Sequence, residues 1–406
     1  MAESGAGAAG TWRRAGIAGA ALGAVAAGAA ATVAIERMTV GRGIRRKAQL
    51  TLEATGPYGA LRGTPGQAVA DDGTSLYYEV DEVGEVEPDG GPESRRRRLF
   101  GDRVPAPVTV VFSPGYCLNQ DSWHFQRAAL RGVVRTVYWD QRSHGRSGRG
   151  ESQRRGEAVS IDQLGRDLKA VIDAAAPEGP LVLVGHSMGG MTMMALADQY
   201  PELVRKRVAA VAFIGTSAGR LEEITYGLPV MGANAVRRVL PGVLKALGTR
   251  AELVERGRRA TAELFGYVIK RYSFASRDVD PAVVRLAERM IEATPIDVVA
   301  EFYPAFADHE KTAALQRFAH LPALVLAGDG DLVTPSEHSE AIADALPESE
   351  LVLLPDAGHL AMLEHPDAVT DRLADLLVRA GAVPAAATVG RYGRTSSTRG
   401  RGRPGG

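Results

Sequence analysis

One serine lies in a pattern that suits a nucleophile. Gly185, Ser187 and Gly189 belong to a single Gly-His-Ser-Met-Gly motif, which follows the apolar run Leu181–Val184 and precedes a helical pattern. A strand, a sharp turn and a helix in this order expose the serine hydroxyl, and the glycines relieve the crowding that the turn creates. The pattern predicts Ser187 as a nucleophile. It also puts the Met188 amide at the helix N-terminus, where the amide can donate to a developing oxyanion.

A serine nucleophile needs a base, and the base needs an acid to orient it. His359 follows the apolar run Leu351–Leu354, and imidazole can take a proton and return it near neutral pH. Asp331 follows the run Ala323–Ala327 and is the predicted acid, with Asp329 as its competitor. The spacing from the neighbouring glycine and proline favours Asp331.

Other residues that could do chemistry form no second site. His186 is expected to support the turn rather than to react. Partnered surface or core positions suit four other histidines, His309, His320, His338 and His365. Cys117 is the only cysteine, which excludes an intramolecular disulfide and a cysteine-based metal site. The sequence shows no metal cluster, Walker loop or dinucleotide fingerprint, so neither a metal nor a cofactor is predicted.

Alternating strands and helices must position these residues. A strand–turn–strand pattern occupies Ala68–Val80, and Ile161–Ala176 has helical periodicity. Short apolar runs, typical of buried strands, occur at Val108–Phe112, Val133–Trp139, Leu181–Val184, Val208–Ile214, Ala323–Ala327 and Leu351–Leu354. This alternation predicts an α/β fold, with a mostly parallel sheet and helices on both faces.

The chain divides into five zones. A catalytic core covers residues 67–217 and resumes at 319–380, and its polar loop 85–107 contains four consecutive arginines, typical of a solvated loop. Residues 218–318 lack a clear buried strand and are expected to form a helical cap. Residues 1–47 form an N-terminal segment with basic flanks, and residues 381–406 form a basic tail that is expected to be disordered.

The N-terminal segment predicts an attachment to a membrane. Ala15–Ile35 is uncharged and about as long as a helix that crosses the ~30 Å hydrocarbon core. Two arginines precede it and five basic residues follow it, which favours a cytoplasmic position for the catalytic domain. Its high content of alanine and glycine leaves an alternative open, a signal peptide that is cleaved after export.

The motifs together resemble the α/β-hydrolase superfamily, in the capped branch of serine esterases and lipases. The resemblance covers residues from about Gln67 to Ala380. Beyond the nucleophile motif, residues 139–147 (Trp-Asp-Gln-Arg-Ser-His-Gly-Arg-Ser) are similar to the family's D-x-R-G-x-G-x-S loop, and Asp356–His359 is similar to its Gly-His segment. The order Ser, Asp, His along the chain is also that of the family. The resemblance implies an α/β-hydrolase fold with a helical cap.

Two positions depart from the family's pattern. Pro114-Gly115-Tyr116 stands where relatives have His-Gly, and the resemblance implies that the Tyr116 amide serves the oxyanion hole together with Met188. The missing histidine raises the question of how this loop is held. Ser143 replaces the usual glycine of the D-x-R-G loop, which puts that loop's conformation in doubt.

The residue types narrow the function to acyl chemistry. A serine at the nucleophile position argues against epoxide hydrolases and haloalkane dehalogenases, which use an aspartate there. The sequence predicts a serine hydrolase that cleaves a carboxylic ester, lipid or thioester through an acyl-enzyme on Ser187. Acyl transfer, perhydrolysis and a non-catalytic ligand-binding role remain alternatives.

Composition bears on the partners. Basic and acidic residues balance at 48 each, so net charge gives no reason to expect a nucleic-acid partner. Aromatic residues in the expected cap, among them Phe302 and Phe306, predict a small-molecule substrate with an apolar acyl or alkyl group. Packing within the cap is the alternative role for these rings.

Overall fold

The computed structural model describes residues 58–84, 106–227 and 269–383, together with positions 231, 234, 238, 239 and 242. The expected N-terminal helix, most of the loop 85–107, the middle of the cap and nearly all of the basic tail lie outside these residues. Among the helices that are described, none has the length and apolar character needed to cross a membrane.

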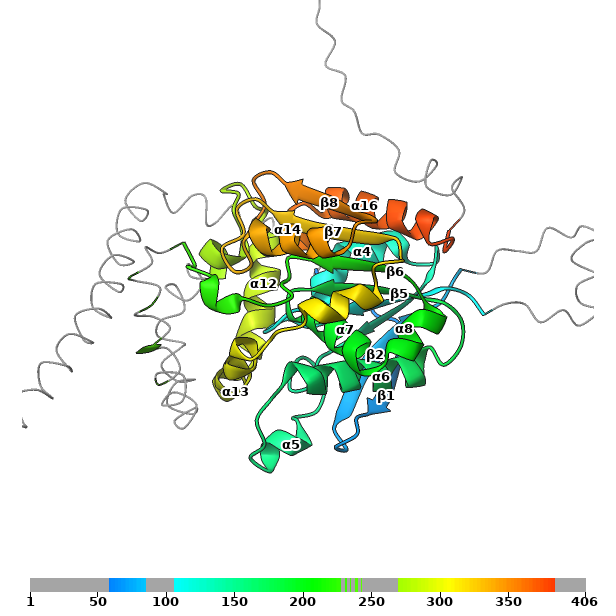
Figure 1. The fold of residues 1–406 in the computed structure, drawn as a ribbon, viewed down its shortest axis with the longest axis horizontal. Coiled ribbons are helices and arrows are strands. Elements are labelled where there is room, and N and C mark those ends of the chain that lie inside the picture. Colours follow the sequence, from blue (N-terminus) through cyan, green and yellow to red (C-terminus); the bar gives the residue numbers. More distant parts are fainter. Residues whose placement is uncertain are drawn as a thin grey trace, which may run out of the picture.

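A twisted eight-stranded sheet forms the centre of the molecule (Figure 1). The strand order is β1-β2-β4-β3-β5-β6-β7-β8; β1 and β2 pair antiparallel, β2 pairs antiparallel with β4, and every later pairing is parallel. The strands are β1 Thr64–Val69, β2 Ser75–Asp81, β3 Thr109–Ser113, β4 Arg135–Trp139, β5 Leu181–His186, β6 Val208–Ile214, β7 Ala323–Gly328 and β8 Ser349–Leu354. The prediction of a mostly parallel α/β sheet is confirmed.

The central strands are apolar because both of their faces are buried. In β5, Leu181 and Leu183 pack into the core on one face, while Val182 and Val184 pack into the core on the other. Strands β6 and β7 alternate in the same way. Side chains of a strand point to opposite faces in turn, so a strand with helices on both sides becomes a continuous apolar run.

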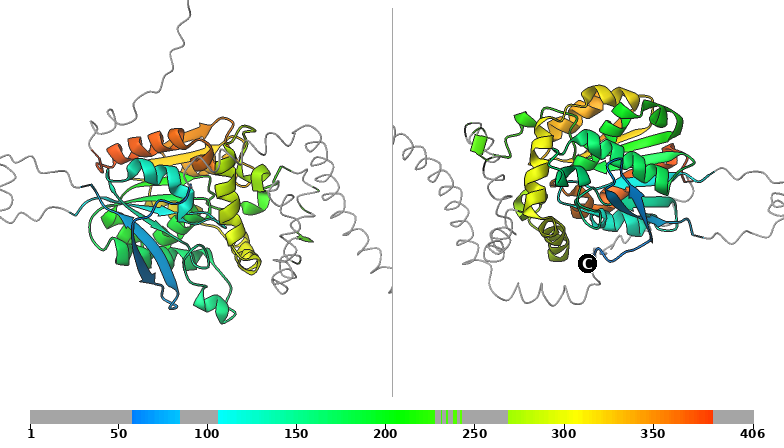
Figure 2. Two further views of the ribbon diagram at one scale, coloured as in Figure 1. Left: turned by 180° about the vertical axis from the view of Figure 1, so that it is seen from behind. Right: turned by 90° about the horizontal axis from the view of Figure 1, so that it is seen from below.

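Helices cover each face of the sheet (Figures 1 and 2). Residues of α6, α7, α14 and η3 build one core, and residues of α4, α12, α15 and α16 build the other. The bounds are η1 Gln120–Trp123, α4 His124–Leu130, α5 Glu151–Arg154, α6 Ile161–Ala175, α7 Met188–Gln199, α8 Pro201–Arg207, η2 Leu221–Glu223, α12 Pro281–Ala293, α13 Ile296–Ala307, η3 Thr312–Arg317, α14 Ser336–Ala345, α15 Ala361–Glu364 and α16 Pro366–Arg379.

Helix α6 shows why the periodic segments fold locally as expected. The Ser160 side chain caps its first turn by accepting a hydrogen bond from the Gln163 amide at 3.2 Å. Leu164, Leu168 and Ile172 share one helix face and are fully buried. The prediction of a helix over 161–176 is confirmed to within one residue at its C-terminal end.

The described part of the expected cap packs in three places, and helix α12 contributes to the core that also contains α4 and α16. Helix α13 lies beyond the ends of β3 and β4, where its Phe302 ring packs near Tyr116 and His144. The segment around η3 instead belongs to the main core, because Leu315 and Phe318 are fully buried in the cluster that contains α7. Of the residues expected to form a cap, those at 312–318 therefore pack with the catalytic core.

Candidate active site

The serine of the Gly-His-Ser-Met-Gly motif sits on a strained turn between β5 and α7. Ser187 has φ 51° and ψ −120°, a conformation that L-residues adopt at a cost of about 1–3 kcal/mol. The glycines permit this turn. A Cβ on Gly185 would lie 2.6 Å from the backbone of Gly189, and a Cβ on Gly189 would lie 2.1 Å from the Ser113 carbonyl oxygen. The turn therefore has the geometry that the motif predicted.

The predicted acid and base are in contact. Nδ1 of His359 and Oδ2 of Asp331 are 2.8 Å apart. The Asp331 side chain is fully buried, whereas the His359 side chain is 11% exposed. Because Nδ1 faces the carboxylate, the other ring nitrogen is the one left to exchange a proton with a reacting group.

Hydrogen bonds keep the buried Asp331 carboxylate ionised. Burial acts to raise its pKa, but His359 and the bonds from the loop outweigh burial and lower it. The amides of Val333 and Thr334 donate to Oδ1 at 2.7 and 2.9 Å, and the Thr334 hydroxyl donates to Oδ2 at 2.9 Å. Asp329 has a different task, since its Oδ1 accepts from the Asp356 amide at 2.9 Å. The geometry thus favours Asp331 over Asp329 as the partner of the histidine.

The strand ends bring the serine and the histidine to one place. His186, next to Ser187, contacts the His359 backbone carbonyl through Nε2 at 2.9 Å, and the two rings lie 4.7 Å apart. Burial lowers the pKa of His186 to about 3, so this imidazole is neutral at physiological pH. This structural role is the one expected for His186.

The segments that carry the two predicted oxyanion donors both lie next to the serine. Met188 is the first residue of α7, and the first amides of a helix have no partner within the helix. Gly115 packs beside the serine, since a Cβ added there would lie 3.2 Å from Ser187 Cβ and 2.7 Å from His186 Nδ1. Tyr116 follows immediately. The two segments expected to stabilise an oxyanion therefore lie on either side of Ser187.

The loop after β4 holds Ser143 in a backbone conformation that non-glycine residues rarely adopt. This residue has φ 64°, the left-handed region that favours glycine. Its hydroxyl accepts a hydrogen bond from the Gly150 amide at 3.1 Å. Asp140 accepts bonds from the amides of Gln120 and Arg146, both at 2.8 Å, while burial raises the pKa of Asp140 to about 6. Ser143 therefore takes up an unfavourable backbone conformation, while hydrogen bonds at Ser143 and Asp140 hold the loop in place.

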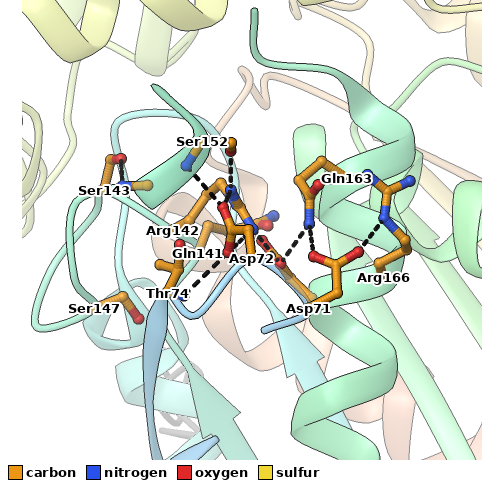
Figure 3. Close-up of polar contacts among 12 residues, drawn as sticks. Asp71, Asp72, Thr74, Gln141, Arg142, Ser143, Ser147, Ser152, Gln163 and Arg166 are labelled. Atoms are coloured by element: carbon orange, nitrogen blue, oxygen red, sulfur yellow. Dashed lines mark hydrogen bonds and ion pairs between the residues drawn. The ribbon is translucent and has the colours of Figure 1, made fainter. Parts of the chain in front are cut away.

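A buried ion network anchors the same loop to the sheet and to α6 (Figure 3). Arg142 forms two hydrogen bonds to Asp167 at 2.6 and 2.7 Å and another to Asp72 at 2.9 Å. The side chains of Arg142 and Asp167 are fully buried. Gln163 and Arg166 extend the network to Asp71. A guanidinium paired in this way holds position and does not exchange protons.

Aromatic rings of α13 pack around Tyr116, near the start of α7. Tyr116 lies 6.2 Å from Phe302 and 5.1 Å from Phe306, measured between ring centroids, and its hydroxyl donates to the Val299 carbonyl. Phe302 also packs against Met188 within one apolar cluster. The two phenylalanines expected to meet substrate thus pack near the oxyanion segments. Phe274, in contrast, packs with the main core.

Sequence reasoning missed three supporting residues. Thr334 bonds the Asp331 carboxylate, and Glu364 accepts from the Gly358 amide at 2.6 Å, which fixes the loop that carries His359. Gln141 contacts both the loop after β3 and helix α7. Only the closeness of Thr334 and Glu364 to motif residues could have suggested them. In the described part of the chain, no group of three or more metal-binding side chains occurs.

Comparison with protein families gives one match, to a model described as alpha/beta hydrolase fold, over residues 108–366. The chain is also similar to individual hydrolases. It is 26% identical over 283 residues to the 2-hydroxy-6-oxo-6-(2'-aminophenyl)hexa-2,4-dienoic acid hydrolase of Metapseudomonas resinovorans, covering 69% of this chain and 87% of that protein. It is 27% identical to the sn-1-specific diacylglycerol lipase ABHD11 of Mus musculus, covering 65% of this chain and 80% of that protein.

A third relative is much longer than the region it shares. The chain is 27% identical to the dihydrolipoyllysine-residue acetyltransferase component of the acetoin cleaving system of Pseudomonas putida, over 68% of this chain but only 64% of that protein. Among solved structures, a thermophilic esterase from Thermogutta terrifontis matches with a TM-score of 0.55 at 23% identity, over 78% of this chain and 98% of its own. The enol-lactonase of Burkholderia xenovorans matches with a TM-score of 0.56 at 23% identity, over 77% and 100%. These structures share the fold.

Proposed function

The chain belongs to the α/β-hydrolase family, and from this premise we propose that it is a serine hydrolase that cleaves an ester-type bond through an acyl-enzyme on Ser187. One observation carries the proposal. A histidine with its Nδ1 bonded at 2.8 Å to a buried carboxylate has its ring 4.7 Å from that of His186, the residue that precedes Ser187 on the strained turn. This is the arrangement that a serine needs to become a nucleophile.

In the proposed mechanism each group has one task. His359 takes the proton of Ser187 as the hydroxyl oxygen attacks the substrate carbonyl, and it then gives the proton to the leaving group. Asp331 holds the tautomer of His359 and stabilises its charged form. The amides of Tyr116 and Met188 donate to the oxyanion, each worth ~3 kcal/mol by analogy with other oxyanion donors. Water then attacks the acyl-enzyme, with His359 as the base.

We propose an apolar acyl or alkyl group of small to medium size for the substrate. Support comes from the rings of Tyr116, Phe302 and Phe306, which pack together beside Met188. Apolar walls with few polar groups are typical of small-molecule sites. Similarity to a diacylglycerol lipase and to a dienoic acid hydrolase is consistent with an acyl substrate.

Two measurements test this proposal. Rapid mixing with p-nitrophenyl acetate is expected to give a burst of nitrophenol equal to the enzyme concentration, followed by slower turnover. Ser187→Ala is expected to abolish both phases, and a burst retained in that variant would refute the acyl-enzyme. A panel of p-nitrophenyl esters of rising chain length then tests the substrate. Equal rates along the panel would contradict an apolar pocket of limited size.

The alternatives predict different results in the same assays. An acyltransferase or perhydrolase would also give the burst. Added alcohol, amine or peroxide would then raise the rate of the second phase well above its rate with water as the only acceptor. A non-catalytic binding protein would give no burst at all. Full-length wild-type protein that binds the esters without releasing nitrophenol would therefore support the binding role.

For location we propose a membrane anchor at Ala15–Ile35 with the catalytic domain on the cytoplasmic side. The proposal rests on the length of this segment and on the basic residues that follow it. Fractionation and protease treatment of spheroplasts test it. Full-length protein that stays in the membrane and resists protease is expected. A shortened, soluble, exported form would identify the segment as a signal peptide.

A further inference from the structure

Gln141 is a buried amide that touches both of the segments on either side of Ser187. Its Nε2 donates to the Pro114 carbonyl at 3.2 Å and to the Thr192 hydroxyl at 3.1 Å. Pro114 begins the loop that leads to Tyr116, and Thr192 lies in the first turn and a half of α7. The Gln141 side chain is fully buried, so solvent does not compete for these bonds.

The direction of each bond follows from the chemistry of the partners. The Pro114 carbonyl can only accept, so the amide nitrogen of Gln141 must face it. The Thr192 hydroxyl accepts from the same nitrogen and donates its own hydrogen to the Met188 carbonyl at 2.8 Å. One chain of hydrogen bonds therefore runs from the Tyr116 loop through Gln141 and Thr192 to Met188.

The two bridged segments are also in direct contact. A small shift of one would therefore displace the other. A Cβ on Gly189 would lie 2.9 Å from the Pro114 carbonyl oxygen, so this carbonyl packs against the start of α7. Gly115 then connects Pro114 to Tyr116 and packs against His186 and Ser187. A hydrogen bond to the Pro114 carbonyl fixes the peptide plane just before Gly115.

The two ends of the Gln141 amide differ in their bonding. Its Oε1 has no hydrogen-bond partner in the part of the chain that the structure describes, although it is buried. A buried acceptor without a partner is destabilising, whereas an apolar side chain of similar shape avoids that cost. The Nε2 end, which bonds Pro114 and Thr192, is therefore the part of Gln141 whose role the structure defines.

We propose that Gln141 is a positioning residue that holds the Tyr116 and Met188 amides in register for the oxyanion. Gln141 thus fixes the loop after β3, in which this chain has Pro-Gly instead of the family's His-Gly. The inference rests on the proposed function, because it presupposes an oxyanion formed at Ser187. Gln141 itself touches neither substrate nor reacting atoms in this account.

The test compares Gln141→Leu with a matched control elsewhere in the fold. Gln126 is also fully buried, donates through Nε2 to a backbone carbonyl and a threonine hydroxyl, and has an Oε1 with no partner among the described residues. Its partners, Met362 and Thr370, lie in α15 and α16. Gln126→Leu thus makes the same chemical change without touching either oxyanion segment.

Three quantities are measured on the full chain, namely kcat and KM with a p-nitrophenyl ester, and Ki for a trifluoromethyl ketone that binds as a tetrahedral oxyanion adduct. In Gln141→Leu, kcat is expected to fall on the order of 10- to 100-fold and Ki to rise by a similar factor, because small misplacement of donors costs that much. KM is expected to change less than about threefold, since the ground state makes little use of the oxyanion donors. Gln126→Leu is expected to leave all three within about twofold of the wild-type values.

Thr192→Val breaks the same chain of hydrogen bonds at its α7 end. This variant provides the test if Gln141→Leu does not fold. It is expected to lower kcat and raise Ki together, while Thr192→Ser, which keeps the hydroxyl, is expected to restore both. The effects of Gln141→Leu and Thr192→Val are expected to be less than additive, because either change breaks the bridge. A folded Gln141→Leu or Thr192→Val variant with unchanged Ki would overturn the proposal.

The outcome separates the positioning role from the proposed function. If Ser187→Ala is inactive while Gln141→Leu keeps the wild-type kcat and Ki, only the positioning role fails. If Ser187→Ala retains activity, the acyl-enzyme fails, and the inference about Gln141 fails with it.

Discussion

Two carboxylates in this molecule are equally buried but pair with different basic side chains. The side chains of Asp331 and Asp167 are both fully buried, and each forms short hydrogen bonds to a basic side chain. Asp331 meets His359, which is partly exposed, whereas Asp167 meets Arg142, which is as buried as the carboxylate itself. Burial and pairing alone therefore do not distinguish the proposed catalytic acid, Asp331, from the structural carboxylate of Asp167.

The basic partner of each carboxylate determines whether the pair can move a proton. Imidazole gains and loses a proton near neutral pH, so the Asp331–His359 pair can change its charge during a reaction. Although burial opposes the charge, Asp167 and Asp72 raise the pKa of Arg142 above its usual value, and the guanidinium stays charged throughout. One pair is suited to moving a proton, and the other to fixing a loop.

The largest predicted effect is on catalysis, at Asp331. Asp331→Asn is expected to lower kcat by roughly 10⁴-fold, about 5 kcal/mol, because the amide favours the wrong tautomer of His359. The fold is expected to survive, as judged by circular dichroism. Asp329→Asn is the control and is expected to change kcat less than about tenfold, since the Asp329 carboxylate accepts from the Asp356 amide and not from His359. The reverse ranking would move the acid to Asp329.

The next effect is on stability, at Arg142. Arg142→Met leaves Asp167 buried without its cation and is expected to cost about 3–5 kcal/mol in the free energy of urea unfolding. Arg142→Met combined with Asp167→Leu is expected to recover part of this loss. At low temperature the folded fraction of Arg142→Met is expected to keep a near-normal KM for p-nitrophenyl esters. A folded variant with no activity would contradict the structural role.

A smaller effect is expected in acid. Bonds from Arg142, Thr74 and the Ser152 amide lower the pKa of Asp72 well below its usual value, despite opposing burial. A lowered native pKa contributes stability above the unfolded pKa of about 3.9, and this stability is lost as pH falls through the native value. Asp72→Asn is therefore expected to unfold more easily at pH 7 and to lose less stability between pH 5 and pH 2. Parallel stability curves for the variant and the wild type would refute this.

The smallest effect is expected at Ser143. Ser143→Gly removes the strain of a non-glycine residue in the left-handed region, which stabilises the fold by about 1 kcal/mol. The same change loses the hydrogen bond from the Gly150 amide, which destabilises the fold by about 1 kcal/mol. The two terms nearly cancel, so thermal unfolding is expected to shift by only a few degrees. A large fall in kcat instead would show that the Ser143 hydroxyl serves the active site.

The sequence predicted the sheet because each central strand is a short apolar run, buried on both faces. It also led to the prediction of Ser187, Asp331 and His359 as a triad, since each follows such a run, and the ends of parallel strands meet at one edge. It could not predict Gln141, Thr334 or Glu364 as supporting residues. Their roles depend on contacts between loops far apart in sequence, and glutamine, threonine and glutamate are common on any surface.

The central claim is that Ser187 is an activated nucleophile, and covalent labelling tests it most directly. Full-length protein is treated with a fluorophosphonate probe, digested, and mapped by mass spectrometry. The account predicts a single adduct on Ser187 in the wild type, no adduct in Ser187→Ala, and strongly slowed labelling in Asp331→Asn. An unlabelled wild-type protein, or equal labelling of Ser187→Ala, would contradict the account.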